Sequence, residues 1–77
     1  MMKVVTSDDC KYCEVLKVIL DTMGKEYKEI KIDTPEGRAL VKKMGIRALP
    51  TIVVNNKAYV GIPPFKKLKK IIDEDND

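Results

Sequence analysis

The chain has 77 residues, of which 44% are hydrophobic and 35% are charged, and its formal net charge is +3. Its apolar runs are too short for a transmembrane helix, and its first residues lack the apolar core and cleavage site of a signal peptide. We therefore expect neither a membrane-spanning nor a secreted protein. One domain over residues 1–77 is expected, located in the cytoplasm, where a free dithiol stays reduced.

A strand and a helix are predicted for the first part of the chain. Residues 3–6 are rich in β-branched side chains, which is typical of a short buried strand. The polar residues 7–9 then offer capping side chains for a helix from about Lys11 to Met23, which Gly24 ends. The apolar positions of this helix recur at helical spacing and are expected to face the core. They are Val15, Leu16, Ile19, Leu20 and Met23.

A second strand and a second helix follow. Residues 27–32 form the strand, with Ile30 and Ile32 on the same face. The run Asp33-Thr34-Pro35 predicts a helix start, because a capping side chain is followed by a proline that fits the first helical position. This helix ends at Gly45 and carries three apolar residues, Leu40, Val41 and Met44.

The last part of the chain predicts a hairpin and a third helix. Residues 51–54 and 57–61 form two strands, joined by a tight turn at Asn55-Asn56. Pro63-Pro64 opens the helix. Its buried side is expected to consist of Phe65, Leu68, Ile71 and Ile72.

Charges gather in this third helix. Its lysines are followed by a group of acids: Lys66, Lys67, Lys69 and Lys70, then Asp73, Glu74, Asp75 and Asp77. Such a lysine cluster suits RNA, but the aromatic and glycine-rich signals of nucleic-acid-binding proteins are missing. We therefore expect a solvated helix face and no nucleic-acid partner. The acids lie unfavourably at a helix C-terminus, where we expect fraying.

The predicted order of elements is β-α-β-α-β-β-α, an α/β fold. The first two strands, joined by a helix, are expected to be parallel through a right-handed crossover. The last two strands form an antiparallel hairpin. The prediction is therefore a four-stranded mixed sheet flanked by three helices, with no linker or repeat.

Cys10 and Cys13 are the only two cysteines of the chain and stand at the predicted start of the first helix. A zinc site needs about four ligands, and the chain has no His, so we expect no intrachain metal. A purely structural disulfide would close a tiny loop and stabilise little. A metal or cluster shared between two chains stays an alternative. We interpret the pair as a redox-active dithiol that needs no cofactor.

The position of the pair predicts different roles for its two sulfurs. At the start of a helix, Cys10 faces unpaired backbone N–H groups and the positive end of the dipole, which favour the thiolate. Lys11 adds a cation, whereas Asp8 and Asp9 oppose the effect, and we expect a net lowering of the Cys10 pKa. Cys13 lies one turn further in and should be more buried. Cys10 would attack a partner disulfide, and Cys13 would resolve the mixed disulfide.

A second signal is Pro50, which stands at the start of a predicted strand, where the loss of an N–H group is tolerated. A cis bond between Leu49 and Pro50 would turn the backbone sharply towards the helix start. On these two residues alone, an ordinary trans proline is the more frequent case.

The chain resembles the thioredoxin superfamily in its small, glutaredoxin-sized form, from residue 3 to residue 72. Its C-K-Y-C run at residues 10–13 is similar to the glutaredoxin motif C-P-Y-C, and residues 45–51 resemble the stretch around the cis-proline of the family. The resemblance implies that Cys10 is the nucleophile, Cys13 the resolving thiol and Pro50 a cis-proline that faces them. It further implies a substrate-binding set of Lys11, Tyr12, Leu49, Pro50 and Gly61.

Departures from the glutaredoxin pattern bear on the electron donor. Glutaredoxins usually hold glutathione with a basic residue before the motif and with Gly-Gly and Thr/Ser-Asp after the hairpin. Here Ser7, Val60-Gly61 and Pro63-Pro64 stand instead, and Asp8 and Asp9 would repel the carboxylates of glutathione.

The resemblance therefore implies a protein disulfide oxidoreductase that is recharged by a thioredoxin-reductase-type flavoenzyme. A glutathione-dependent glutaredoxin is the alternative, and a metal- or cluster-bridging dimer is a further one. We expect a monomer that acts on disulfide-bearing proteins, without a membrane partner.

Overall fold

Four strands form one mixed sheet in the order β2-β1-β3-β4. The structure is a computed structural model that describes residues 1–76. It confirms the predicted order of elements, which is β1 (Lys3–Thr6), α1 (Lys11–Thr22), β2 (Lys28–Lys31), α2 (Pro35–Met44), β3 (Thr51–Val54), β4 (Lys57–Val60) and α3 (Phe65–Asn76).

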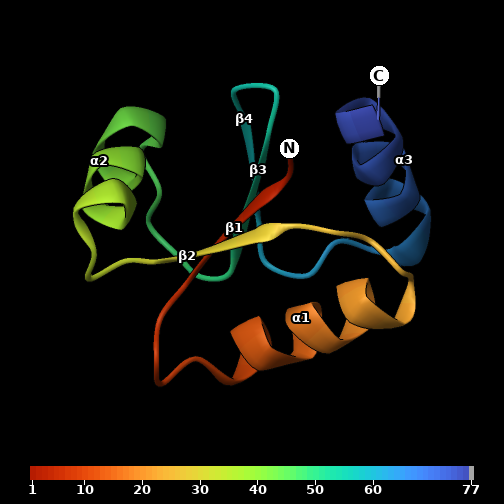
Figure 1. Ribbon diagram of the computed structural model, residues 1–77, viewed down its shortest axis with the longest axis horizontal. Coiled ribbons are helices and arrows are strands. Elements are labelled where there is room, and N and C mark those ends of the chain that lie inside the picture. The colour runs from red at the N-terminus through yellow and green to blue at the C-terminus, as the bar shows by residue number, and fades with distance from the viewer. Residues whose placement is uncertain (77) are drawn as a thin grey trace.

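The strand register brings four separate segments to one edge of the sheet. β1 and β2 are parallel, with Thr6 beside Lys31. β3 runs antiparallel to both β1 and β4, so that its first residue, Thr51, pairs with Val5 and with Val60. The segments after β1, after β2, before β3 and after β4 therefore all meet at this edge (Figure 1).

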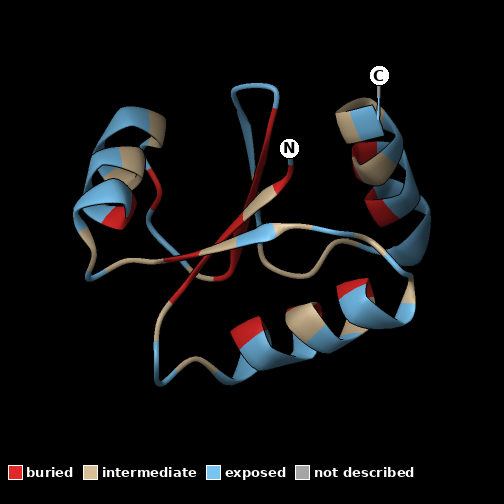
Figure 2. Cartoon of the chain, in the orientation of Figure 1, coloured by how far each residue is buried: buried red, intermediate tan, exposed pale blue. Residues whose placement is uncertain are grey.

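The three helices cover both faces of the sheet. One buried cluster joins α1 and α3 to the sheet and consists of Met2, Val4, Leu16, Leu20, Ile52, Val54, Leu68 and Ile71. The other cluster lies under α2 and is built on Val5, Ile46 and Val53. Figure 2 shows these buried residues along β1 and β3 and on the inner faces of the helices.

Local sequence signals explain where α2 begins and ends. Thr34 caps the helix, because its hydroxyl oxygen accepts the N–H of Gly37 at 3.0 Å and donates to the Lys31 carbonyl at 2.7 Å. Pro35 occupies the first turn. Gly45 ends the helix in the left-handed conformation, at φ +66°. These features confirm the predicted helix bounds.

The hairpin turn is also confirmed. Asn55 and Asn56 have φ values of +51° and +64°, which is the backbone of a two-residue hairpin turn. β4 ends at Val60, one residue earlier than expected, and β2 and α1 are likewise shorter than the predicted ranges.

The prediction that Val15 and Phe65 belong to the core is wrong. Val15 is 42% exposed and Phe65 is 63% exposed. Val15 precedes Leu16 by about 100° around the helix, so it turns away when Leu16 and Leu20 face the sheet. Phe65 is the first residue of α3 and lies under the ammonium group of Lys69, 5.7 Å from its ring centre, instead of in the core.

The expectation that the acidic end of the third helix frays is also wrong for the residues that the structure describes. α3 continues to Asn76, and the Asp75 side chain is only 7% exposed. Its carboxylate accepts from Lys25 at 2.7 Å and lies 3.4 Å from the N-terminal amine of Met1. The hydrogen bond from Lys25 lowers the pKa of Asp75, which keeps the carboxylate ionised. Asp77, which belonged to the same expectation, lies outside the described residues.

Within residues 1–76, none of the helices combines the length and the apolar character needed to cross a membrane.

Candidate active site

Cys10 is the N-cap of α1 and is joined to Cys13 by a disulfide. Its backbone is extended, with φ −109° and ψ 103°, and its Sγ accepts the N–H of Cys13 at 3.1 Å. Cys13 is fully buried, whereas Cys10 is only half-buried. The sequence thus places the less buried cysteine at the positive end of a helix, where an anion is stabilised, and the fully buried cysteine one turn further along the helix.

The acidic residues before the motif are not equivalent. The Asp8 carboxylate lies 3.1 Å from Nζ of Lys31 at the end of β2, and this contact raises the pKa of Lys31. Asp9 is exposed and forms no ion pair within residues 1–76. Asp8 therefore has a cationic partner, which it shares with Glu29 at 3.5 Å, whereas Asp9 is the acid beside Cys10 that has none among the described residues.

The segment before β3 lies at the same edge of the sheet as the cysteines. The Leu49–Pro50 peptide bond is cis, and Pro50 is buried. The Pro50 carbonyl oxygen accepts the N–H of Gly61 at 2.7 Å, and Thr51 closes the turn by donating to the Ala48 carbonyl at 2.7 Å. The structure thus brings Pro50 and Gly61, which are distant in sequence, into direct contact.

The other expected substrate-binding residues lie on the first turn of α1. Lys11 and Tyr12 are exposed, Tyr12 at 67%. Neither side chain has a hydrogen bond to another described residue, so both are open to a partner.

The structure contains a polar network between α1 and the sheet that the sequence did not predict. Glu29 on β2 accepts from the buried hydroxyl of Thr6 at 2.7 Å and from Lys17 at 3.0 Å, and Lys17 also pairs with Glu14 at 2.6 Å. Burial alone would raise the pKa of Glu29, but the hydrogen bonds from Thr6 and Lys17 outweigh it and lower that pKa overall.

This network lies close to Cys10 and Cys13 along the chain. Lys17 is one helical turn after Cys13, and Thr6 is the last residue of β1, before the loop to Cys10. The signal that could have indicated this network is Glu29. It is a charged residue that pairs with Val4 in the sheet and lies on the face that α1 covers. The network ties β1, β2 and α1 together directly below the motif.

A metal-ligand cluster is not seen in the described part of the chain: no three His, Cys, Asp or Glu side chains are grouped to hold an ion.

Comparison with known proteins agrees with this geometry. The sequence model of the family described as Glutaredoxin matches residues 2–59. The chain belongs to the glutaredoxin family. A protein of Archaeoglobus fulgidus named "Probable Thioredoxin" is 34% identical, and the match covers 94% of this chain and 85% of that protein. Family membership and the Cys10–Cys13 disulfide together identify a thiol–disulfide oxidoreductase.

Solved structures share the fold. A thioredoxin-like protein superposes with a TM-score of 0.78 at 23% identity, over 92% of this chain and 99% of that one. NrdH-redoxin from Escherichia coli superposes with a TM-score of 0.74 at 23% identity, and the match covers 88% of this chain and 91% of that one. A glutaredoxin of Archaeoglobus fulgidus superposes with a TM-score of 0.72 at 23% identity, and the match covers 92% of this chain and 84% of that one. The thioredoxin-like fold expected from the sequence is thereby confirmed.

Proposed function

We propose that this redoxin reduces disulfides of other proteins through Cys10 and Cys13. The observation that carries the proposal is the disulfide at the N-cap of α1, in which Cys10 is half-buried and Cys13 is fully buried. Only the outer sulfur can meet a protein disulfide, and the inner one is held within reach of it. The remaining expectations, a single domain that acts as a monomer in the cytoplasm, belong to the same proposal.

In the first step, the thiolate of Cys10 attacks one sulfur of the target disulfide. A bond forms between Cys10 and that sulfur, the target S–S bond breaks, and the other target sulfur leaves as a thiolate that takes a proton from water. The helix N-terminus stabilises the attacking thiolate, and Lys11 adds a positive charge at its side.

In the second step, Cys13 loses its proton and attacks the sulfur of Cys10. The intramolecular disulfide forms, the mixed disulfide breaks, and the second target sulfur leaves and is protonated. Two electrons and two protons have then passed to the target, and the protein is in the disulfide form described above. In this form the N–H of Cys13 donates to the Cys10 sulfur at 3.1 Å.

Substrate binding is assigned to the same edge of the sheet. Leu49 precedes the buried Pro50 and offers its backbone to an extended substrate segment, in the manner of strand addition. Gly61 holds the Pro50 segment in place by donating its N–H to the Pro50 carbonyl oxygen. Tyr12 and Lys11 flank the sulfurs on the exposed side of α1.

The proposed electron donor is a flavoenzyme of the thioredoxin-reductase type, which returns two electrons and two protons to the disulfide. Two similar proteins support this choice. One is named "Probable Thioredoxin", and NrdH-redoxin is described as a glutaredoxin-like protein with a thioredoxin-like activity profile. The uncompensated Asp9 beside Cys10 argues against the two carboxylates of glutathione. Glutathione remains the competing donor because the family match is to glutaredoxins.

The test is reduction of insulin by dithiothreitol, catalysed by the wild type and by Cys10→Ser. The wild type should accelerate precipitation of insulin, and Cys10→Ser should not. Equal rates would overturn the proposal. Cys13→Ser is the companion variant, which should accumulate as a mixed disulfide with insulin, detectable by mass. The donor is decided by supplying NADPH with a thioredoxin reductase or with glutathione and glutathione reductase in parallel.

A further inference from the structure

Lys17 is the charged residue that shares a face of α1 with Cys13. The two positions are four residues apart, so they lie about 40° from each other around the helix and one turn along it. Long side chains of a helix lean towards its N-terminus, which directs the lysine back towards the turn of Cys13. The ion pair with Glu14, three residues earlier, confirms this direction, with 2.6 Å between Nζ and the carboxylate.

The sheet holds the ammonium group of Lys17 in this place. Nζ donates to Glu29 on β2 at 3.0 Å, and Glu29 also accepts from the buried hydroxyl of Thr6 at 2.7 Å. The Lys17 side chain is only 19% exposed. The hydrogen bonds to Glu14 and Glu29 raise the pKa of Lys17, although burial opposes them. The cation is therefore fixed between helix and sheet and keeps its charge over the pH range in which a thiol ionises.

Cys13 needs such a cation when it resolves the mixed disulfide. It is fully buried, and burial among apolar groups disfavours a thiolate. The other buried residues on its face of α1, Leu16 and Leu20, are apolar and offer no hydrogen bond. The positive charge of Lys17, one turn further along the same face, reduces the free energy needed to ionise Cys13.

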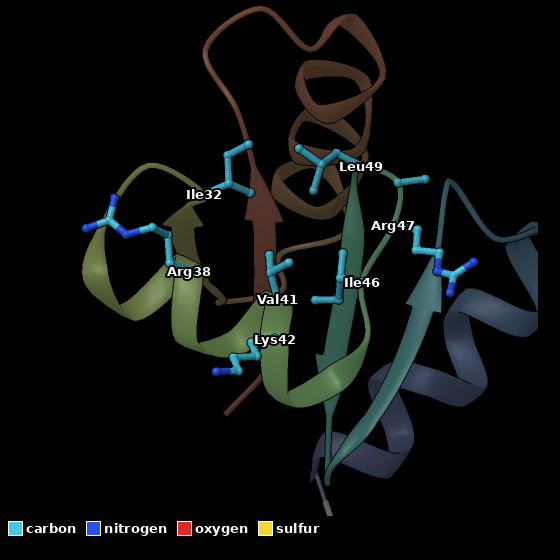
Figure 3. A pocket seen from close by; sticks show the side chains of 8 residues that line it. Ile32, Arg38, Val41, Lys42, Ile46, Arg47 and Leu49 are labelled. Carbon is cyan, nitrogen blue, oxygen red and sulfur yellow. The ribbon is translucent and has the colours of Figure 1, made fainter.

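The other charged groups around the motif are more exposed than Lys17. The Lys31 side chain is 35% exposed, and its Nζ lies 3.1 Å from the Asp8 carboxylate. Asp9 and Lys11 are exposed beside the outer cysteine. Three more cations line a pocket on the α2 side of the sheet, away from α1: Arg38, Lys42 and Arg47 (Figure 3). Lys17 is thus the cation near the motif whose charge is least screened by solvent.

We propose that Lys17 promotes the second step of the reaction, because its ammonium group stabilises the thiolate of Cys13 that attacks the Cys10 sulfur. This inference rests on the proposed function, since it assigns a residue to the release of the target. Cys13 gives its proton to water, the bond between the two cysteines forms, the bond from Cys10 to the target breaks, and the leaving target sulfur takes a proton from water. Lys17 keeps its own proton and acts through Cys13, so it is a positioning residue.

The test follows the two steps separately with dithiobis(nitrobenzoate), mixed with an equal amount of the reduced protein. Attack by Cys10 releases a first coloured thiolate at a rate that depends on concentration, and resolution by Cys13 releases a second at a rate that does not. In Lys17→Gln the first phase should stay close to that of the wild type, and the second should slow about threefold at neutral pH. The glutamine amide can still donate to Glu29, which preserves a contact with the sheet.

The pH dependence of the second phase distinguishes a charge effect from a structural one. Without the cation, the pH at which this phase reaches half its maximal rate should rise. The rates of variant and wild type should converge at alkaline pH, where Cys13 is ionised in both proteins. Lys17→Arg keeps the charge and should keep the profile of the wild type. A slowing in Lys17→Gln that persists at alkaline pH would overturn the inference.

Two control variants test the net charge and the contact with the sheet. Lys28→Gln removes a cation of β2 that pairs with Glu36 of α2 at 3.1 Å, and it should leave the second phase unchanged. Glu29→Gln weakens the link between α1 and β2 but leaves the ammonium group, and it should not slow the second phase. If either control slows the second phase as much as Lys17→Gln does, the inference is overturned.

The same measurements separate this inference from the proposed function. A wild type that shows neither phase and does not reduce insulin overturns the proposed function, and the role of Lys17 with it. A wild type that shows both phases, together with an unchanged second phase in Lys17→Gln, overturns the role of Lys17 alone.

Discussion

Gly61 donates its backbone N–H to the Pro50 carbonyl oxygen at 2.7 Å, and this contact fixes the end of β4 against the start of β3. Gly61 has φ +83°, a conformation that side chains with a β-carbon rarely adopt, although open space surrounds the position of the missing carbon. The contact therefore requires glycine because of the positive φ at this position, and a β-carbon would meet no neighbouring atom there. It positions the cis-proline next to Leu49, whose backbone we propose for substrate binding.

Replacement of Gly61 by Ala should weaken both stability and substrate binding. The strained backbone should cost about 1–2 kcal/mol of unfolding free energy, measured in urea. Because the strain is relieved by loss of the contact with Pro50, KM for insulin should rise while kcat changes little. Gly24→Ala is the control, since Gly24 has φ +71° and open space but lies at the far end of α1. An equal rise in KM for both variants would show that Gly61 acts only through stability.

The two aspartates before Cys10 should differ in their effect on anionic disulfides. Asp9→Asn removes an uncompensated charge, so reduction of a glutathione-containing mixed disulfide should accelerate about two- to fivefold at low salt. Asp8→Asn should have a smaller effect, because Nζ of Lys31 lies 3.1 Å from the Asp8 carboxylate and offsets part of its charge. An uncharged substrate, hydroxyethyl disulfide, supplies the reference rate for each variant. The reverse order of the two effects would contradict the assignment of the free charge to Asp9.

The sequence predicted the backbone of the site well, because its signals are local. The cap at Thr34, the left-handed Gly45 and the asparagine turn all depend on neighbouring residues, and each is confirmed. The first cysteine at a helix start follows from the same kind of signal. Cis geometry at Pro50 required the family resemblance, since Leu-Pro alone favours trans.

Long-range contacts between polar side chains could not be predicted in this way. Glu29 and Lys17 are twelve residues apart, and Lys25 and Asp75 are fifty apart. No periodicity links such pairs, and only the packing of α1 and α3 on the same face of the sheet brings them together. The sequence likewise did not predict that Arg38 and Arg47 line one pocket, because only the return of the chain from α2 to β3 brings them to the same side of the sheet.

Gly37 allows α2 to approach the end of β2, and its replacement by Ala should reverse the usual effect of that change. In an exposed helix, Gly→Ala stabilises by about 1 kcal/mol. Here a β-carbon would overlap the Lys31 carbonyl oxygen and lie 2.8 Å from Cα of Ile32, so α2 would have to shift. We expect a loss of about 2–3 kcal/mol in urea unfolding, as for overpacked cores. A gain in stability would show that α2 is not held against β2 at this point.

The Glu29 network should give the protein a specific dependence of stability on pH. The folded-state pKa of Glu29 lies below its ordinary value: burial opposes this, but the hydrogen bonds from Thr6 and Lys17 prevail. A lowered folded pKa stabilises the protein above the unfolded value of about 4.3, and this contribution is lost as the pH falls through the folded pKa.

Glu29→Gln should therefore lower the free energy of unfolding by about 1 kcal/mol near neutral pH. At a pH of about 3.5 the difference between the variant and the wild type should be smaller. Urea unfolding at both pH values measures the two differences. Glu26→Gln is the control, because Glu26 is exposed and forms no ion pair with a described residue. A loss for Glu29→Gln that is the same at both pH values would mean that Glu29 acts through packing, since only the ionised carboxylate can lose its contribution on protonation.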